Sequence, residues 1–377
     1  MFGKPVTLFQ ILGFRVQLDF SWILLALLIS WSLATAYFPA FYLGLDHATY
    51  WWMGVIGALG LFGSIVFHEL AHSIVARRYG MPIKSITLFV FGGVAQMDEE
   101  PPSPKAEFLM AIAGPISSFF LSGFCYLAFD VGYRQGLSLP FIGILSYLAL
   151  VNSVLGTFNL VPAFPLDGGR VLRAALWRWK NDIRLATQSA SRVGSLFGLI
   201  LMLSGGFQVI TGNFMVGVWW FVMGLFLRGA ANASYYQLIA RTTLEGEAVR
   251  RFMTANPDTV ATDLSIHALV EHHFYRSLHE MYPVMRDSHL VGCVTSKQVA
   301  AIPRDQWTRL TVFDAMTPCS ETNTVSVDTD ALKALSIMNR TGNSRLMVTE
   351  EDRLVGVITL KDLMKPLAVR LNLEETR

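Results

Sequence analysis

The chain has 377 residues, of which 53% are hydrophobic and only 15% are charged, and its formal net charge is +2. This composition and the mean hydropathy of +0.43 are unlike those of an ordinary soluble protein, in which about 25% of residues are charged. The small net charge, without any basic block, argues against a nucleic-acid partner, and the widely spaced Cys125, Cys293 and Cys319 exclude a disulfide framework or a cysteine-based metal site.

Long apolar runs fill the chain up to about residue 240, whereas charges are dense from about residue 245 onward. A membrane-spanning helix needs about 20 mostly apolar residues. No cleavable signal peptide is expected, because no small-residue cleavage pattern follows the first run. The sequence predicts a polytopic α-helical membrane domain over residues 1–240, with six spans at 18–39, 51–76, 106–130, 138–160, 192–211 and 213–235.

Lysine and arginine are distributed asymmetrically among the segments that join these spans. Six alternating spans place only Arg134 on one side of the membrane. Because basic loops are retained in the cytoplasm, the other side is predicted to be cytoplasmic, with both termini on it. The basic residues on that side are Lys4, Arg15, Arg77, Arg78, Lys84, Lys105, Arg170, Arg173, Arg178, Lys180 and Arg184.

The second predicted span contains a zinc-hydrolase pattern, H-E-x-x-H, formed by His68, Glu69 and His72. On a helix, histidines four residues apart project from one face, so both imidazoles can reach one metal ion. Glu69 is adjacent and could accept a proton from water. The alternative is a pair of unrelated histidines, but an ionisable group at the membrane centre is disfavoured by roughly 2.5–3.5 kcal/mol. The pattern therefore favours a metal site.

Residues 83–96 interrupt the series of helices. They follow Gly80 and Pro82, are rich in β-branched and aromatic residues, and contain Gly92 and Gly93. This composition predicts a short strand or hairpin. Non-helical backbone is tolerated within the membrane only where protein covers it or where it lines a water-filled cavity.

Small residues in the third predicted span indicate close packing between helices. They are Gly114, Ser117, Ser118 and Gly123.

A catalytic zinc site usually has three protein ligands and a water molecule, so a third ligand is expected from another segment. The stretch "NLVPAFPLDGGR" (Asn159–Arg170) ends a predicted span and contains Asp167. A carboxylate beside Pro165 and two glycines suits a non-helical ligand loop. Taken alone, however, Asp167 is better explained as the N-cap of a helix that begins near Gly168.

Together, "HELAH" and "NLVPAFPLDGG" resemble the motifs of the site-2 protease family of intramembrane zinc metalloproteases (peptidase family M50). The resemblance extends to the number of spans, to the strand-like "FVFGGVAQM" and to "AIAGP" at Ala111–Pro115. It implies one zinc ion per chain, with His68, His72 and Asp167 as ligands and Glu69 as the general base.

The same resemblance implies two sites for the substrate. Asn159 matches an asparagine that contacts the substrate or the oxyanion. The strand that contains Gly92 and Gly93 would pair with an unwound substrate segment through backbone hydrogen bonds.

After residue 245 the chain contains an internal repeat. "VRRFMT" (Val249–Thr254) recurs 63 residues later as "VFDAMT" (Val312–Thr317), and "HLVGCVTSKQV" recurs 64 residues later as "RLVGVITLKDL". Helical stretches lie between these motifs. The pattern resembles a tandem pair of CBS domains in a soluble α/β module, expected at residues 245–305 and 306–377.

The resemblance to tandem CBS modules implies a sensor of adenine nucleotides, with ATP, ADP or AMP as its ligand. Thr359 and Asp362 match positions that commonly bind phosphate and ribose, whereas the first repeat keeps Thr295 but has Gln298 in place of the acid. One nucleotide site is therefore expected to be degenerate. A purely structural role, or homo-oligomerisation through the module, is an equally good explanation.

The predicted function is that of an intramembrane endopeptidase, which cleaves a membrane protein within or near its transmembrane segment and acts in regulated proteolysis. The alternative is a transporter or channel, since CBS pairs are attached to those as well. A transporter of that kind predicts inverted repeats, and residues 1–240 contain no such symmetry. A third possibility is a pseudoprotease that binds substrate without cleaving it, but the intact set of ligands and Glu69 argue against it.

Overall fold

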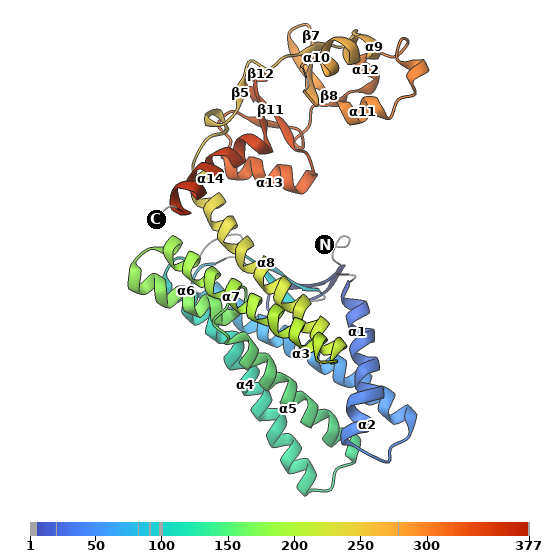
Figure 1. The fold of residues 1–377 in the computed structure, drawn as a ribbon, viewed down its shortest axis with the longest axis vertical. Coiled ribbons are helices and arrows are strands. Elements are labelled where there is room, and N and C mark those ends of the chain that lie inside the picture. The colour runs from blue at the N-terminus through green and yellow to red at the C-terminus, as the bar shows by residue number, and fades with distance from the viewer. Residues whose placement is uncertain are drawn as a thin grey trace. The chain divides into compact units, whose positions relative to one another are not determined.

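The chain divides into two compact units, Met1–Tyr235 and Tyr236–Arg377. Among the residues that the structure describes, the first unit contains long helices and one four-stranded sheet, and the second contains short helices and two four-stranded sheets (Figure 1). The structure, a computed structural model, describes residues 6–19, 21–81, 83–89, 92–97, 101–277 and 279–375.

Among the described residues, six helices are long and apolar enough to cross a membrane, as predicted. The last but one of them begins at Ile183 rather than at residue 192, because polar turns capped by Asp182 extend it. The described helices that begin in the first unit are α1 (Ser21–Ser32), α2 (Phe38–Phe41), α3 (His47–Arg78), α4 (Pro104–Arg134), α5 (Leu139–Asn159), α6 (Asp167–Lys180), α7 (Ile183–Ile210) and α8 (Phe214–Leu244). The last residues of α8 belong to the second unit.

Local signals explain where α3 and α4 begin. Asp46 caps α3 by accepting a hydrogen bond from the backbone N–H of Thr49 at 3.3 Å. Ser103 caps α4 through the N–H of Ala106, and Pro104 occupies the first turn, where no N–H is needed.

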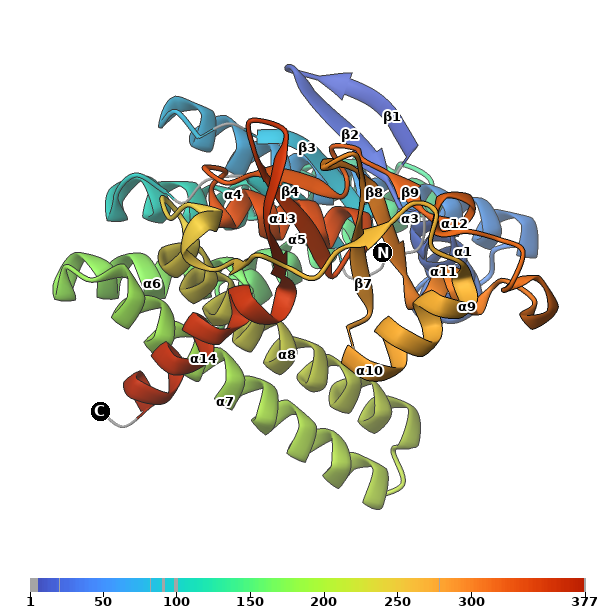
Figure 2. The same cartoon turned by 90° about the horizontal axis from the view of Figure 1, so that it is seen from above.

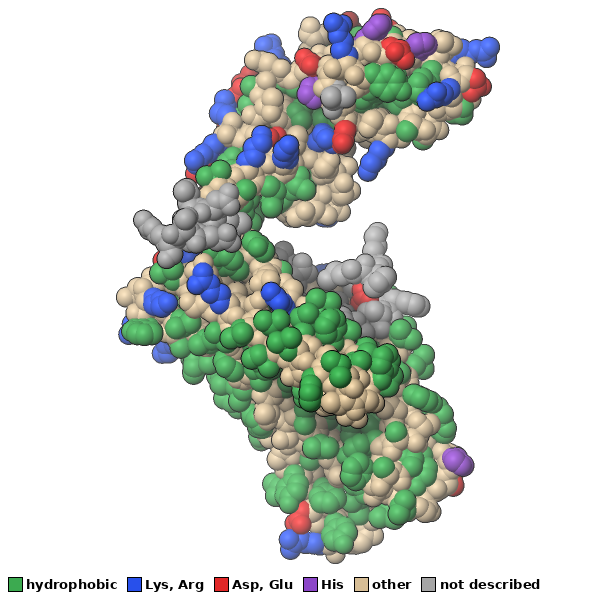
Figure 3. Space-filling model, viewed as in Figure 1, with side chains coloured by type: hydrophobic (Ala, Val, Ile, Leu, Met, Phe, Trp, Pro, Cys, Tyr) green, Lys and Arg blue, Asp and Glu red, His purple; other side chains and the backbone are tan. Residues whose placement is uncertain are grey.

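Hydrophobic side chains are spread over the outer faces of the long helices (Figure 3). Leu24 is 72% exposed, Phe120 69% and Leu203 66%. Apolar surface of this extent is unfavourable in water and typical of helices that face lipid. The first unit is therefore a polytopic helical membrane domain.

The sheet of the first unit has the strand order β1 (Val6–Ile11), β2 (Phe14–Leu18), β3 (Ile83–Phe89) and β4 (Gly92–Met97). β2 and β3 are parallel, and the other neighbours are antiparallel. The hairpin of β3 and β4 was predicted, although Val90 and Phe91 lie outside the described residues. The hairpin of β1 and β2 was not predicted. Figure 2 shows β1 at the outer edge of this sheet.

The second unit has two sheets with the strand orders β6-β7-β8-β9 and β10-β11-β12-β5. Its strands are β5 (Thr254–Ala255), β6 (Val260–Ala261), β7 (Met281–Arg286), β8 (His289–Thr295), β9 (Thr317–Pro318), β10 (Thr324–Ser326), β11 (Arg345–Glu350) and β12 (Arg353–Thr359). Its helices are α9 (Ile266–Leu269), α10 (Tyr275–Ser277), α11 (Ser296–Ala300), α12 (Val312–Ala315), α13 (Ala331–Thr341) and α14 (Leu360–Glu375).

The two repeats exchange a strand. β5, from the first repeat, pairs with β12 in the sheet of the second, and β9, from the second repeat, pairs with β8 in the sheet of the first. Gly292 and Gly356 lie where these strands pack closely. A Cβ at Gly292 would lie 2.3 Å from the carbonyl oxygen of Thr317, and one at Gly356 would lie 2.7 Å from Met253 Sδ. Each repeat therefore needs the other to complete its sheet.

Candidate metal centre

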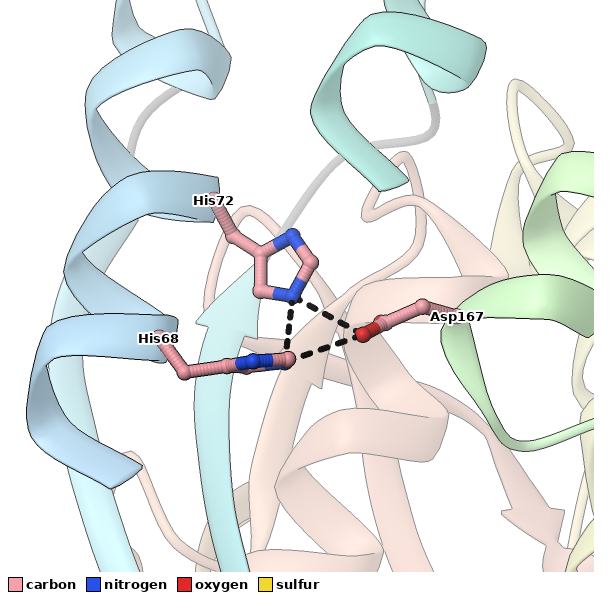
Figure 4. Close-up of side chains that lie close together, drawn as sticks. All are labelled: His68, His72 and Asp167. Carbon is pink, nitrogen blue, oxygen red and sulfur yellow. Dashed lines mark hydrogen bonds and ion pairs between the residues drawn. The ribbon is translucent and has the colours of Figure 1, made fainter. Parts of the chain in front are cut away.

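Three side chains predicted as zinc ligands converge in the first unit (Figure 4). His68 and His72 project from α3, and Asp167 is the first residue of α6. Asp167 Oδ2 lies 3.0 Å from His68 Nε2 and 3.1 Å from His72 Nε2, and the two Nε2 atoms are 3.1 Å apart. The histidines are 4% and 8% exposed. The site therefore joins two segments about a hundred residues apart in sequence.

Asp167 is not the cap of α6. The N-cap position is Leu166, and the Asp167 carboxylate contacts the two histidines instead. The interpretation of Asp167 as a helix N-cap is therefore wrong.

The outer nitrogens of both imidazoles are held by α4. His72 Nδ1 lies 2.7 Å from the carbonyl oxygen of Met110, and His68 Nδ1 lies 2.8 Å from Ser118 Oγ. A carbonyl oxygen can only accept, so His72 Nδ1 must be the donor and carry the proton. In the neutral ring the Nε2 lone pair is then free to bind a metal.

Gly114 lies against the inner nitrogens of the same rings. A Cβ at this position would come within 2.2 Å of His72 Nε2 and 2.5 Å of His68 Nε2. Gly114 and Ser118 were predicted to serve helix packing, and the structure shows that their neighbours are the candidate ligands. Their spacing of four residues on one helix face was the signal available in the sequence.

The donor set fits a zinc ion. With Nδ1 protonated, His72 presents a lone pair toward the Asp167 carboxylate, and a cation between them relieves the repulsion. Ligand atoms bound 2.0–2.1 Å from a tetrahedral zinc lie roughly 3.3 Å from one another. The separations of 3.0–3.1 Å are close to that value.

The other residues predicted for this site lie on α3, α5 and β4. Glu69 follows His68 on α3 and is partly exposed, whereas both histidines are buried. Asn159 is the last residue of α5, and its amide donates to the carbonyl oxygen of Leu155 at 3.0 Å, within its own helix. Gly92 and Gly93 begin β4, opposite Phe89 and Leu88.

In the second unit, the residues predicted for nucleotide binding form two equivalent helix caps. Thr359 Oγ1 donates to Asp362 Oδ2 at 2.6 Å and accepts from the Asp362 N–H at 3.1 Å. Thr295 and Gln298 make the corresponding bonds at the start of α11. The cap in each repeat explains these residue pairs without any ligand.

A cavity of about 280 Å³ adjoins the cap of the first repeat. Thr295, Lys297, Gln298, Ser344 and Arg345 contribute to its lining, so it lies between the two repeats. Its volume is at the lower end of the range for ligand pockets, about 300–1,000 Å³. The described cavity thus adjoins the site that was expected to be degenerate.

Comparison with known proteins identifies the family. The model of peptidase family M50 matches residues 56–137 and 134–205, and the CBS domain model matches residues 312–369. Rip3 of Mycobacterium tuberculosis is 34% identical over 369 residues, which cover 97% of this chain and 93% of that protein. The chain belongs to peptidase family M50.

A curated protein and a solved structure from Methanocaldococcus jannaschii also match. The zinc metalloprotease MJ0392 is 32% identical over 375 residues and 98% of both chains. A solved structure of a site-2 protease is 32% identical, with a TM-score of 0.43 over 62% of this chain and 95% of that one. This M50 peptidase is an integral membrane zinc metalloendopeptidase with a C-terminal tandem CBS module.

Proposed function

We propose that this peptidase cleaves a peptide bond within or near the transmembrane segment of a membrane protein. The observation that supports this most directly is the convergence of His68, His72 and Asp167, buried in a unit whose long helices are apolar on the outside. A soluble substrate would not reach ligands in that setting as readily as a membrane-embedded one. The proposed role is regulated intramembrane proteolysis.

The three converging side chains would hold one zinc ion. When bound, zinc supplies Lewis acidity, which activates water near neutral pH and polarises a carbonyl group. Glu69 would accept the proton of the attacking water and deliver it to the leaving amine. Its position supports this role, because it adjoins His68 and is partly exposed, so that water and substrate can approach it.

The substrate must present an extended backbone, because the amide carbonyls of a helix are already hydrogen-bonded. Within the described residues, β4 and β1 are the two edge strands of this sheet, and Gly92 and Gly93 lie at the start of β4. We assign this edge to substrate pairing. Asn159, at the end of α5, would contact the substrate or the oxyanion after its amide leaves the carbonyl oxygen of Leu155.

The orientation follows from the basic residues. Arg77 and Arg78 end α3 only five residues after His72, and α6 carries Arg178 and Lys180 in its last turn. With this end in the cytoplasm, as the distribution of basic residues favours, both termini are cytoplasmic and water reaches the site from that side.

Two variants test the catalytic proposal. Glu69→Gln should abolish cleavage of a membrane-embedded reporter and leave bound zinc unchanged, and retained cleavage would exclude Glu69 as the base. Asp167→Ala should lose the zinc that the wild-type protein binds at one ion per chain, whereas unchanged zinc content would remove Asp167 from the site. Asp130→Asn, at the far end of α4 in an exposed pair with Arg134, is the control for both measurements.

We also propose that the CBS module binds an adenine nucleotide, which regulates cleavage. The cavity of about 280 Å³ supports this, because Lys297 offers positive charge for phosphate among polar groups such as Gln298. Arg345 lines the same cavity but is paired there with Glu280 at 2.8 Å. Calorimetric titration of the intact protein with ATP, ADP and AMP should give saturable heat that Lys297→Ala weakens. The matched substitution Lys333→Ala, at an exposed position of α13, should leave it unchanged. Absence of heat with all three nucleotides would favour a structural or dimerising role.

A further inference from the structure

A buried ion pair links α4 to α6. Glu107, in the first turn of α4, is fully buried, and Arg173, on α6, is 7% exposed. Arg173 Nε donates to Glu107 Oε1 at 2.5 Å, and Nη2 of the same guanidinium also contacts that oxygen. Such a pair has a defined direction and length, unlike a contact between aliphatic side chains.

Glu107 lies on the face of α4 that holds the histidines. Positions 107, 110, 114 and 118 follow the helical spacing of three or four residues, so they share one side of the helix. Met110 binds His72 through its carbonyl oxygen, Gly114 lies against both rings, and Ser118 contacts His68. The carboxylate that receives Arg173 is thus part of the surface that fixes the two imidazoles.

Arg173 also contacts the loop that leads into Asp167. Its guanidinium carbon lies 5.4 Å from the centre of the Phe164 ring, and Phe164 precedes Asp167 by three residues. Phe164 is buried, and it packs against Ala190 of α7 and Ala231 of α8. Arg173 therefore connects α4, whose residues contact both imidazoles, to α6 and the loop before it, which carry the Asp167 carboxylate.

From this arrangement we propose that Glu107 and Arg173 position Asp167 against His68 and His72 and so set the affinity of the site for zinc. The proposal rests on the proposed role of Asp167 as the third ligand. Neither residue is one of the three converging ligand side chains. Loss of the Glu107 charge leaves the buried Arg173 without its counterpart, and a lysine at position 173 lacks the planar guanidinium that contacts Glu107. In either case α6 shifts relative to α4, and the carboxylate is no longer held 3.0–3.1 Å from the two nitrogens.

The test is a zinc-chelator competition on the purified, intact protein. Glu107→Gln and Arg173→Lys keep the size or the charge of the side chain but lose the charged, planar pairing, and each should weaken zinc binding by about 10- to 100-fold. Exchange of the two residues (Glu107→Arg with Arg173→Glu) should recover part of that loss. Asp130→Asn, on the same helix but in an exposed pair, should bind zinc like the wild type.

The outcomes separate this proposal from the ligand assignment. Zinc affinity within about twofold of the wild type in folded Glu107→Gln and Arg173→Lys, beside a large loss in Asp167→Asn, would overturn only the positioning role. Wild-type affinity in Asp167→Asn would overturn the ligand assignment and the positioning role with it. If the charge variants do not fold, Phe164→Leu, which removes the ring but no charge, should still weaken zinc binding, and unchanged affinity there would overturn the proposal.

Discussion

The backbone of Gly114 lies in direct contact with the imidazole of His72, so that a Cβ at position 114 would come within 2.2 Å of His72 Nε2. It would also lie 2.5 Å from His68 Nε2. The space for a metal ion is therefore bounded on one side by a glycine of α4, and no larger residue fits there while both rings keep their positions.

Gly114→Ala should displace both imidazoles and weaken zinc binding by at least about 100-fold, measured as metal content after dialysis against a weak chelator. The control is Gly123→Ala on the same helix, where an added Cβ would meet no atom within 4 Å. Equal zinc content in the two variants would contradict the observed packing.

Ser118→Ala should weaken zinc binding by about 10-fold, because His68 Nδ1 loses its partner and the ring is no longer held in one orientation. Ser117→Ala is the matched control. The Ser117 hydroxyl donates to the carbonyl oxygen of Gly114 within α4, so its removal should leave the affinity nearly unchanged. A chelator titration that ranks the two variants in the opposite order would refute the assigned role of Ser118.

Gly356→Ala should loosen the exchanged strand β5. The added methyl group would overlap with Met253 Sδ and lie 2.9 Å from the carbonyl oxygen of Thr254, and overpacking of this kind costs about 1–3 kcal/mol. Hydrogen–deuterium exchange of the intact protein should be faster in β5 and β12. Arg353→Ala, at an exposed position of β12, serves as the control, and equal protection in both variants would count against the strand exchange.

The cap of α14 should make the second repeat sensitive to acid. Burial alone would raise the pKa of Asp362, but hydrogen bonds from Lys365 and Thr359 outweigh it and hold the pKa below its usual range. A lowered pKa in the folded state stabilises the fold above the unfolded value of about 3.9, and this contribution is lost as the pH falls through the folded pKa.

Asp362→Asn should therefore destabilise the module by about 0.3–1.5 kcal/mol at pH 7, and the difference from the wild type should vanish in strong acid. Thermal unfolding of the intact protein between pH 7 and pH 2 measures this difference. Gln298→Glu supplies the reverse case, since it places an acid in the equivalent cap of α11. A difference for Asp362→Asn that stays constant down to pH 2 would contradict the expected titration.

Much of the fold was predictable because its signals are local. The six spans follow from the length of the apolar runs, and the hairpin of β3 and β4 follows from its β-branched residues and glycines. The hairpin of β1 and β2 was missed. Its buried residues alternate as Phe14, Val16 and Leu18, a strand pattern in the segment before the first predicted span, for which no element was predicted.

The candidate site was predictable in part for the same reason. His68 and His72 share one helix face whatever surrounds them, because the spacing of four residues nearly matches one turn. The role of Asp167 could not be decided from its sequence neighbours alone, because a carboxylate at the start of a helix can serve either as an N-cap or as a metal ligand. Only packing brings it within 3.0 Å of His68.

The sequence alone determined the membrane character of the first unit, the two histidines with Glu69, and the duplication in the second unit. Each of these is a long apolar run, a short motif or a repeat along the chain. The tertiary structure decided which groups surround the histidines, how α6 is held against α4 by Glu107 and Arg173, and that the two repeats exchange β5 and β9. Those relations join residues far apart in the chain, and they depend on how whole helices and sheets pack, which no local pattern specifies.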